Sequence, residues 1–170
     1  VEETGVAIIN DISGGELDKQ MFDTVASLQV PYILMHMRGT PATMQTLTDY
    51  DDLLSDMIAY FQVRLDRLSQ LGVADVILDP GFGFSKTLEQ NYLLLNRMHE
   101  LSVLDRPVLA GLSRKLMLYK ALGITQEESL NATTAVNMVA LLGGAKILRV
   151  HDTKAAAETI AIYNQLQQNQ

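Results

Sequence analysis

The chain has 170 residues, of which 48% are hydrophobic and 19% are charged, a composition that suits one globular unit with a substantial core. Its net charge of −7 argues against nucleic acid as a partner, and no apolar run is long enough to cross a membrane. The absence of cysteine excludes disulfides and cysteine-based zinc sites and fits a cytoplasmic protein. The first ten residues lack both signal-peptide features and an initiator methionine, so we expect a fragment or a processed chain.

Five short apolar runs alternate with helical patterns along the chain. The runs begin near Val6, Pro31, Ala74, Pro107 and Ala145. They are hydrophobic nearly throughout rather than at every second position, which is typical of strands buried on both faces of a parallel sheet. In the segment 50–68, apolar residues recur at three- and four-residue spacing, which predicts an amphipathic helix.

Three short motifs predict where helices begin and end. The sequence TLEQ at 87–90 and the sequence TQEE at 125–128 both have the pattern of a capping box. Gly143 and Gly144 are suited to ending the helix that follows Thr125.

The order strand, helix, strand, helix indicates the α/β class, and two architectures fit it. A doubly wound sheet carries helices on both faces, whereas a (β/α)8 barrel carries them all outside. Five units in 170 residues give about 34 residues each. A full barrel at that rate needs about 270 residues, so a barrel here is partial and lacks three units.

Polar groups follow every apolar run, where parallel α/β folds collect their chemistry. The loop DPGFGFSK at 79–86 has two glycines that permit tight turns, and we expect Phe82 and Phe84 to stand exposed at its tip. Aromatic rings beside the carboxylate of Asp79 can hold a flat ligand that donates hydrogen bonds, and Asn10 can add a donor and an acceptor. A rigid hydrophobic loop without a ligand is the alternative.

The last apolar run is followed closely by Arg149 and His151. Two residues apart on a strand, these side chains can lean the same way, and barrels often bind phosphate at this position. Arginine suits an anion with several oxygens, and histidine adds another donor. The three histidines of the chain form no recognisable metal-binding motif, so we expect no zinc site built by the protein.

Other strand-end residues have simpler interpretations. Ser13, Asp152 and Thr153 are interpreted as helix caps, Arg38 and Lys86 as solvated loop charges, and Met35 and Met37 as core or pocket-wall residues.

The motifs INDISGG, MHMRGTP, ILDPGFGFSK, LAGLSRK and LRVHD occur in the order and approximate spacing of the dihydropteroate synthase family. The chain resembles its bacterial members over essentially all of residues 1–170. The resemblance implies the C-terminal five βα units of a single pterin-binding barrel domain of the TIM type. Segments similar to the family's NVTPDS, STRPG and SIDT loops are absent from the sequence. We therefore expect a fragment that is inactive or impaired alone.

The resemblance also implies an activity in folate biosynthesis. The family condenses 6-hydroxymethyl-7,8-dihydropterin diphosphate with 4-aminobenzoate, gives 7,8-dihydropteroate and diphosphate, uses Mg²⁺ with the diphosphate, and is the target of sulfonamides. By resemblance, Asn10, Met37, Asp79, Lys115 and Arg149 bind pterin, Arg149 and His151 bind diphosphate, and Phe84 and Ser113 bind aminobenzoate. Asp79, Lys115 and Arg149 are the implied catalytic residues, and no residue of this chain is implied as a metal ligand.

The resemblance further implies a homodimer or a self-associating fragment, with the helices near 126–142 and 153–168 as interface candidates. Two other functions stay open. One is a pterin-binding methyltransferase, which shares the barrel but does not need the residues at 113–115 and 149–151. The other is a non-catalytic pterin-binding module.

Overall fold

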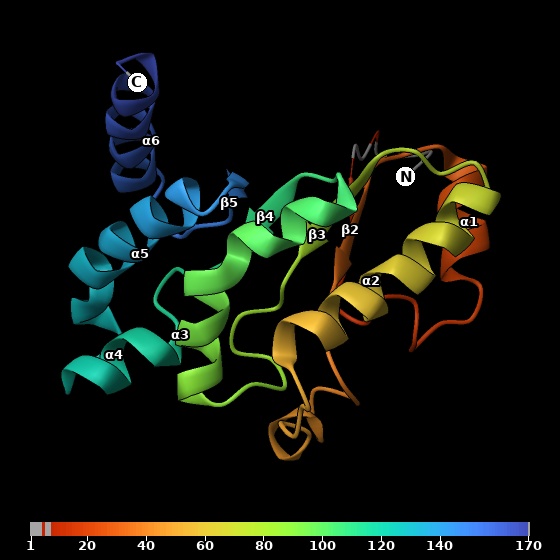
Figure 1. Ribbon diagram of the computed structural model, residues 1–170, viewed down its shortest axis with the longest axis horizontal. Helices are drawn as coiled ribbons and strands as arrows, with labels where there is room; N and C mark the ends of the chain where they lie inside the picture. The colour runs from red at the N-terminus through yellow and green to blue at the C-terminus, as the bar shows by residue number, and fades with distance from the viewer. Residues whose placement is uncertain (1–4, 6–7, 170) are drawn as a thin grey trace.

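The computed structural model describes residue 5 and residues 8–169, and it contains a five-stranded sheet in which all paired strands are parallel (Figure 1). The strands are β1 (Ile9–Asp11), β2 (Tyr32–Met35), β3 (Val76–Asp79), β4 (Val108–Ala110) and β5 (Ala145–Leu148). Each lies within a predicted apolar run, although the predicted beginning near Val6 falls outside the described residues. The strands are short because the polar strand-end segments start directly after them.

The order of strands in the sheet, β1-β2-β3-β4-β5, decides between the two predicted architectures. A doubly wound sheet reverses its strand order at a switch point, whereas a barrel sheet adds each strand beside the previous one. Crossovers of one hand then place every helix on the same face. The fold is therefore the barrel type, in five consecutive units.

In the described part of the chain, six α-helices connect and follow the strands. They are α1 (Met21–Leu28), α2 (Leu53–Gln70), α3 (Leu88–Arg97), α4 (Leu116–Leu122), α5 (Leu130–Leu142) and α6 (Thr153–Gln168). Three 3-10 segments, η1 (Met44–Thr46), η2 (Met98–Leu104) and η3 (Glu127–Ser129), complete the described elements. Helices that are neighbours in sequence also lie near one another in space, from α1 on the right of the view to α6 on the left (Figure 1). In the described part of the chain, no helix has the length and apolar character that a membrane crossing requires.

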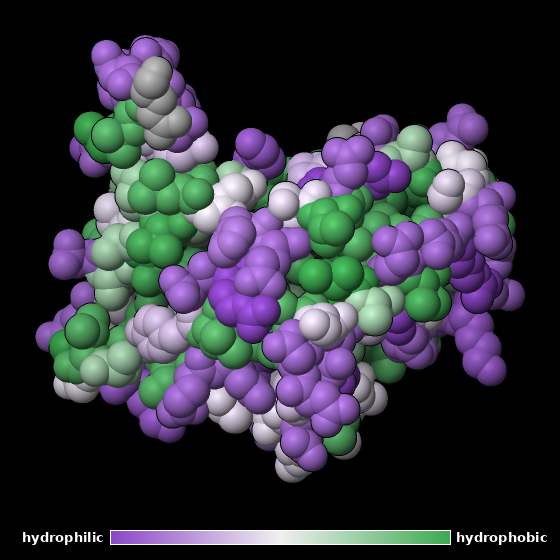
Figure 2. Space-filling model, in the orientation of Figure 1, coloured by the Kyte–Doolittle hydropathy of each residue, from purple (hydrophilic) through white to green (hydrophobic). Residues whose placement is uncertain are grey.

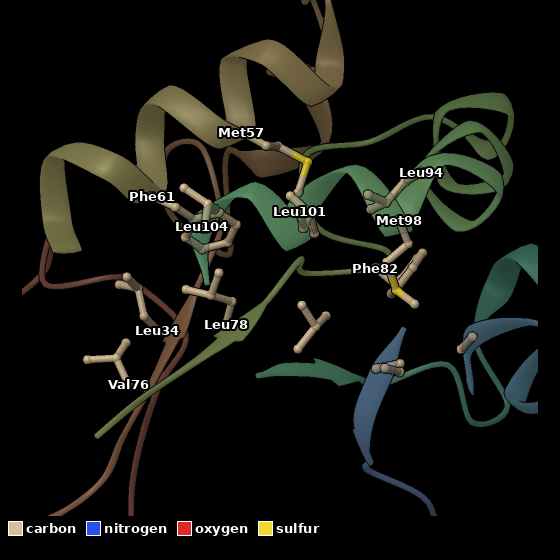
Figure 3. Close-up of a cluster of buried hydrophobic side chains, with 14 of the residues drawn as sticks. Leu34, Met57, Phe61, Val76, Leu78, Phe82, Leu94, Met98, Leu101 and Leu104 are labelled. Atoms are coloured by element: carbon tan, nitrogen blue, oxygen red, sulfur yellow. The ribbon is translucent and has the colours of Figure 1, made fainter. Parts of the chain in front are cut away.

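The main hydrophobic core lies between the sheet and the helices (Figure 3). Leu34 and Leu78 face it from neighbouring strands and are fully buried, together with Met57 and Phe61 of α2. Because strand side chains alternate between faces, the residues next to Leu34 and Leu78 along each strand must lie on the opposite, inner face of the sheet. Burial of the helix-facing stripe therefore leaves alternate positions free to build a site.

The structure confirms two of the three predicted helix boundaries. At the start of α3, Thr87 and Gln90 form a capping box. Thr125 and Glu128 make the same reciprocal pair of hydrogen bonds, but around η3 rather than at the start of α5. Helix α5 ends at Leu142, with Gly143 as its C-cap.

Candidate functional site

Asp79 ends β3, and its side chain is only 1% exposed. One carboxylate oxygen, Oδ1, accepts a hydrogen bond of 2.8 Å from the backbone N–H of Gly81. The other, Oδ2, lies 2.7 Å from Nη2 of Arg149 but has no aligned hydrogen bond within the described residues. Buried carboxylate oxygens ordinarily have donors, so Oδ2 is available to a ligand that brings one.

The turn after Asp79 depends on glycine. Gly81 has φ +67°, and a Cβ added there would lie 2.1 Å from the backbone oxygen of His36. That oxygen belongs to the neighbouring β2 unit and cannot move aside easily, since His36 also donates its backbone N–H to the oxygen of Asp79. The close approach fixes the direction in which the Asp79 carboxylate points.

Arg149 follows β5 directly and crosses the inner face of the sheet. Its Nη1 donates a hydrogen bond of 3.1 Å to Oδ1 of Asn10 on β1, while Nη2 faces Asp79. Because β1 and β5 form opposite edges, a flat sheet would separate them by four strand spacings, about 19 Å. One arginine side chain spans them only because the sheet curls, as a barrel wall does. The inner face is therefore concave at this point.

The guanidinium of Arg149 also needs space beside β4. A Cβ added at Gly111 would lie 2.8 Å from Nη2 of Arg149. The structure thus brings three predicted residues into one cluster: Asn10 from β1, Asp79 from β3 and Arg149 from the segment just after β5.

Lys115 and Phe84 form a second predicted pair near this cluster. The Nζ of Lys115 lies 4.7 Å from the centre of the Phe84 ring, a cation–π contact. Phe84 is half-buried at the loop after β3, and Lys115 immediately precedes α4. Burial lowers the pKa of Lys115, Asp79 raises it in part, and Arg149 lowers it further. The charges of Asp79 and Arg149 both act on this lysine, consistent with a place beside their cluster.

Ser113 and His151 are joined to each other. The backbone N–H of His151 donates a hydrogen bond of 3.2 Å to Oγ of Ser113, and the ring Nδ1 lies 2.9 Å from the same oxygen. Strand β5 ends at Leu148, so Arg149 and His151 both lie beyond it, with different partners. Their shared role toward an anion stays a prediction.

Met37 is 4% exposed and lies outside the main core cluster. It follows Met35 at the two-residue spacing of one sheet face, and Met35 pairs in register with Asp79. This arrangement is consistent with a pocket wall.

Three simpler interpretations of loop residues, those of Phe82, Lys86 and Ser13, were wrong, each for a local reason. Phe82 is not exposed at the loop tip but is 1% exposed in the core beside Met98 (Figure 3), because the two glycines turn its side chain toward the helices. Lys86 is not a solvated charge but is 4% exposed, since the inward-facing carbonyls of its loop supply acceptors. No spacing in the sequence reveals which residue would reach them.

Of the three predicted helix caps, Ser13 is wrong, Asp152 lies at the predicted N-cap position, and Thr153 is the first residue of α6. Ser13 caps no helix, since α1 begins only at Met21, and its Oγ donates to Asp11 at 2.7 Å. Asp152 stands at the N-cap of α6 but its carboxylate makes no cap hydrogen bond. It accepts two hydrogen bonds of 2.9 Å from Arg114 instead, because a bidentate ion pair is the stronger interaction.

Arg38 is only partly solvated. Its guanidinium carbon lies 3.8 Å from the centre of the Tyr50 ring, and its Nη2 pairs with Asp56 at 2.9 Å. Across the described part of the chain, no group of three or more histidine, aspartate or glutamate residues could hold a metal ion.

The model of the family "Pterin binding enzyme" matches residues 1–151. The dihydropteroate synthase of Synechocystis is 41% identical over 167 residues, covering 96% of this chain and 58% of the relative. The folic acid synthesis protein fol1 of Schizosaccharomyces pombe is 40% identical, over 95% of this chain and 23% of the relative. This chain thus spans less than two thirds of these curated relatives.

Solved structures give the same picture. Yersinia pestis dihydropteroate synthase with a sulfonamide drug superposes with a TM-score of 0.95 at 35% identity, covering 99% of this chain and 62% of that one. The Thermus thermophilus enzyme in complex with 6HMPPP gives a TM-score of 0.92 at 34% identity, covering 98% and 66%.

Proposed function

The chain belongs to the family of pterin-binding enzymes, and on that premise we propose that it is the C-terminal part, residues 1–170, of the barrel domain of a dihydropteroate synthase. The proposed reaction joins 6-hydroxymethyl-7,8-dihydropterin diphosphate to 4-aminobenzoate and releases diphosphate. It is supported by the shared names and the sequence identity of the relatives, and by the cluster on the concave face. The cytoplasmic location stays a prediction.

One observation carries the proposal: the guanidinium of Arg149 lies between the acceptor oxygens of Asp79 and Asn10. A guanidinium is a flat group whose N–H donors lie along one edge, and the amino-pyrimidine edge of a pterin has the same character. The acceptor oxygens of Asp79 and Asn10, which receive the guanidinium edge of Arg149, can therefore also receive the amino-pyrimidine edge of a pterin. The pterin would take the place of Arg149 beside Asp79, and Arg149 would then be free to face the diphosphate.

The proposed chemistry uses electrostatics rather than a protein nucleophile. The C–O bond to the diphosphate breaks, and the electron pair leaves with the diphosphate, near the donors Arg149 and His151. The pterin-methyl cation that remains is stabilised by the negative charge of Asp79. The aromatic amine attacks this carbon and then loses its proton to water.

Two further residues would bind on either side of this reaction. Lys115 would donate to the carbonyl and ring nitrogen of the pterin, and the Phe84 ring would line the aminobenzoate subsite with Ser113. Mg²⁺ would arrive with the substrate diphosphate and neutralise part of its charge. The described residues contain no group of three or more histidine, aspartate or glutamate residues that could hold it, and the steps above use only the protein's own side chains.

Calorimetric titration with a 6-hydroxymethyl-dihydropterin analogue, with and without Mg²⁺ and diphosphate, tests the proposal. The proposal predicts micromolar binding that Asp79→Asn weakens by about a hundredfold, about 2.8 kcal/mol. The exposed Asp51→Asn is the matched control and should bind like the parent chain. A folded chain that binds no pterin, or an Asp79→Asn variant that binds as well as the parent, would overturn it.

We also propose that a second copy of the chain docks on α5 and α6. Hydrophobic side chains gather along α5 beside α6 (Figure 2), and a pocket of about 310 Å³ between them is lined by Ala135, Met138 and Ile162. The exposed apolar residues there are Leu130, Val139, Leu142, Ile160, Ile162 and Leu166. Analytical ultracentrifugation should show a dimer that Ile162→Glu dissociates into monomers. A parent chain that stays monomeric even at a 100-fold higher protein concentration than in the binding experiments would contradict this.

A further inference from the structure

Lys86 is a buried lysine that the proposed reaction does not use. Burial lowers its pKa to about 7, although Asp79 raises it in part, so the ammonium form predominates below that pH. The side chain is 4% exposed, and its Nζ lies 3.1 Å from the backbone oxygen of Gly81, 3.0 Å from that of Phe84 and 3.1 Å from Nδ1 of His36. An ammonium has three N–H donors, and three acceptors surround this one. The match is complete when Nδ1 of His36 carries no proton.

The environment of His36 favours the neutral ring that this match requires. Its ring is 1% exposed, and burial lowers its pKa well below the ordinary value, with the nearby charges of Lys86, Arg38 and Arg64 lowering it further. A neutral ring has one nitrogen free to accept, and the contact with Lys86 assigns that nitrogen as Nδ1. The remaining proton is therefore on Nε2.

The two carbonyls that Lys86 binds are at opposite ends of the loop tip, 81–84. The oxygen of Gly81 also accepts the backbone N–H of Phe84 at 3.0 Å, so Lys86 closes a turn that already exists. The same loop has positive φ at Gly81, Gly83 and Ser85, a conformation that turns its carbonyls inward. Without Lys86, the oxygen of Gly81 would keep only the N–H of Phe84, and the oxygen of Phe84 would lose its hydrogen bond from the lysine.

We propose that Lys86 is a positioning residue for the aminobenzoate side of the site: its ammonium ties the loop tip, 81–84, to His36 and thereby sets the Phe84 ring beneath Lys115. Of Lys86, His36 and Phe84, only Phe84 is proposed to touch substrate, so Lys86 acts through it. This inference rests on the proposed function for its substrate and on the geometry alone for the loop.

The position of Lys86 differs from that of the pterin cluster. Asp79 is fixed by Gly81 and by the backbone pairing of β2 with β3, and Asn10 by β1. Loss of the lysine should therefore loosen the Phe84 ring much more than the Asp79 carboxylate. A general loss of fold stability would weaken the binding of both ligands to the same extent.

The test compares Lys86→Met with Lys86→Arg, which keeps N–H donors, and with Lys154→Met, whose lysine side chain is 92% exposed. Calorimetry measures the pterin analogue alone, and then 4-aminobenzoate in the presence of pterin analogue and diphosphate. The inference predicts that Lys86→Met weakens the binding of 4-aminobenzoate at least tenfold and the binding of the pterin analogue less than threefold. Lys86→Arg should recover part of the loss, and the control should change neither.

Equal weakening of both ligands, or of neither, would overturn the positioning role. Hydrogen exchange of the Phe84 amide gives a readout that needs no substrate. It should accelerate at least tenfold in Lys86→Met and stay unchanged in Lys154→Met. If the parent chain binds neither ligand, the proposed function fails, and an unchanged Phe84 exchange rate would then overturn the positioning role separately.

Nitrogen NMR of the parent chain keeps the inference testable even if Lys86→Met does not fold. At pH 6, the ring of His36 should have an unprotonated Nδ1 and a protonated Nε2. A protonated Nδ1 would mean that Lys86 does not donate to it, and would overturn the inference.

Discussion

Two aspartates, Asp11 and Asp79, end β1 and β3, on either side of β2, and both are buried, yet their surroundings differ. Asp11, at the end of β1, is 8% exposed and all its hydrogen-bonding capacity is used within the fold. Its Oδ1 accepts from the N–H and the hydroxyl of Ser13, and its Oδ2 accepts from the N–H of Gly15 and from the hydroxyl of Tyr32 at 2.6 Å. In Asp79, Oδ1 accepts a hydrogen bond from the backbone of the fold, but Oδ2 faces only Arg149 and accepts no aligned hydrogen bond.

The difference follows from the face of the sheet that each residue occupies. Asp11 pairs in register with Leu34, a helix-facing core residue, whereas Asp79 pairs with Met35, on the inner face. The same residue type at the same end of a strand thus stabilises the fold on one face and offers an acceptor on the other. Satisfied hydrogen bonding, rather than burial, separates a structural carboxylate from a binding one.

The largest expected effect on stability comes from Asp11→Asn. An amide in place of the carboxylate sets a donor against the donors of Ser13, Gly15 or Tyr32, and we expect a loss of about 3 kcal/mol in the free energy of unfolding. Urea denaturation at pH 7 measures it, with Asp51→Asn as the exposed control. A loss no greater than that of the control would break the comparison, because Asp11 would then not be structural.

The contribution of Asp11 should also disappear in acid. Burial raises the pKa of Asp11, but the hydrogen bonds from Tyr32, Ser13 and Gly15 together leave the pKa below its ordinary value. A carboxyl with a lowered pKa stabilises the fold fully above about pH 4 and loses that contribution as the pH falls through its folded-state pKa. The gap between the parent chain and Asp11→Asn should therefore narrow in urea denaturation below pH 4. A gap that widens there would contradict the assignment.

Tyr32→Phe removes a single donor from the Asp11 network. Burial, and next the hydrogen bond to Asp11, raise the pKa of Tyr32, so its hydroxyl stays a donor over the whole working pH range. A hydrogen bond to a charged acceptor contributes about 1.5–3 kcal/mol, and the loss on unfolding should be of that size. Tyr163→Phe on α6 is the matched control, and equal losses in the two variants would contradict this estimate.

The smallest expected effect concerns the binding aspartate, Asp79, and its neighbour Arg149. Arg149→Gln removes the cation that lies against the Asp79 carboxylate where the pterin would bind. In the absence of diphosphate, the pterin analogue should therefore bind roughly threefold to tenfold more tightly, a gain of about 0.7–1.4 kcal/mol. Diphosphate should bind more weakly to the same variant. Calorimetry with each ligand separately gives both numbers. Weaker binding of the pterin analogue alone would show that Arg149 holds the pterin instead of occupying its place.

Much of the fold could be predicted from the sequence. Continuous apolar runs separated by helical patterns gave all five strands, because burial on both faces leaves that signature. The choice between barrel and doubly wound sheet was not visible in these runs, since both architectures bury their strands alike. It needed the strand order, which reflects long-range pairing.

The strand-end rule found Asn10, Asp79 and Arg149, and the structure brings them together. It did not separate Asn10 from Asp11, although their adjacent positions place them on opposite faces. Phe82 and Lys86 were misassigned because the backbone turns at positive φ in their loop, and a turn of that kind redirects side chains in ways that spacing does not show.

The most direct test measures two quantities for two variants: the affinity for the pterin analogue and the free energy of unfolding, for Asp79→Asn and Asp11→Asn. The comparison predicts that Asp79→Asn loses about a hundredfold in affinity and less than about 1 kcal/mol in stability, because its second oxygen has no hydrogen bond to lose. Asp11→Asn should lose stability while its folded fraction binds within threefold of the parent chain. The reverse pattern, or equal losses in both variants, would contradict the division between a structural and a binding aspartate.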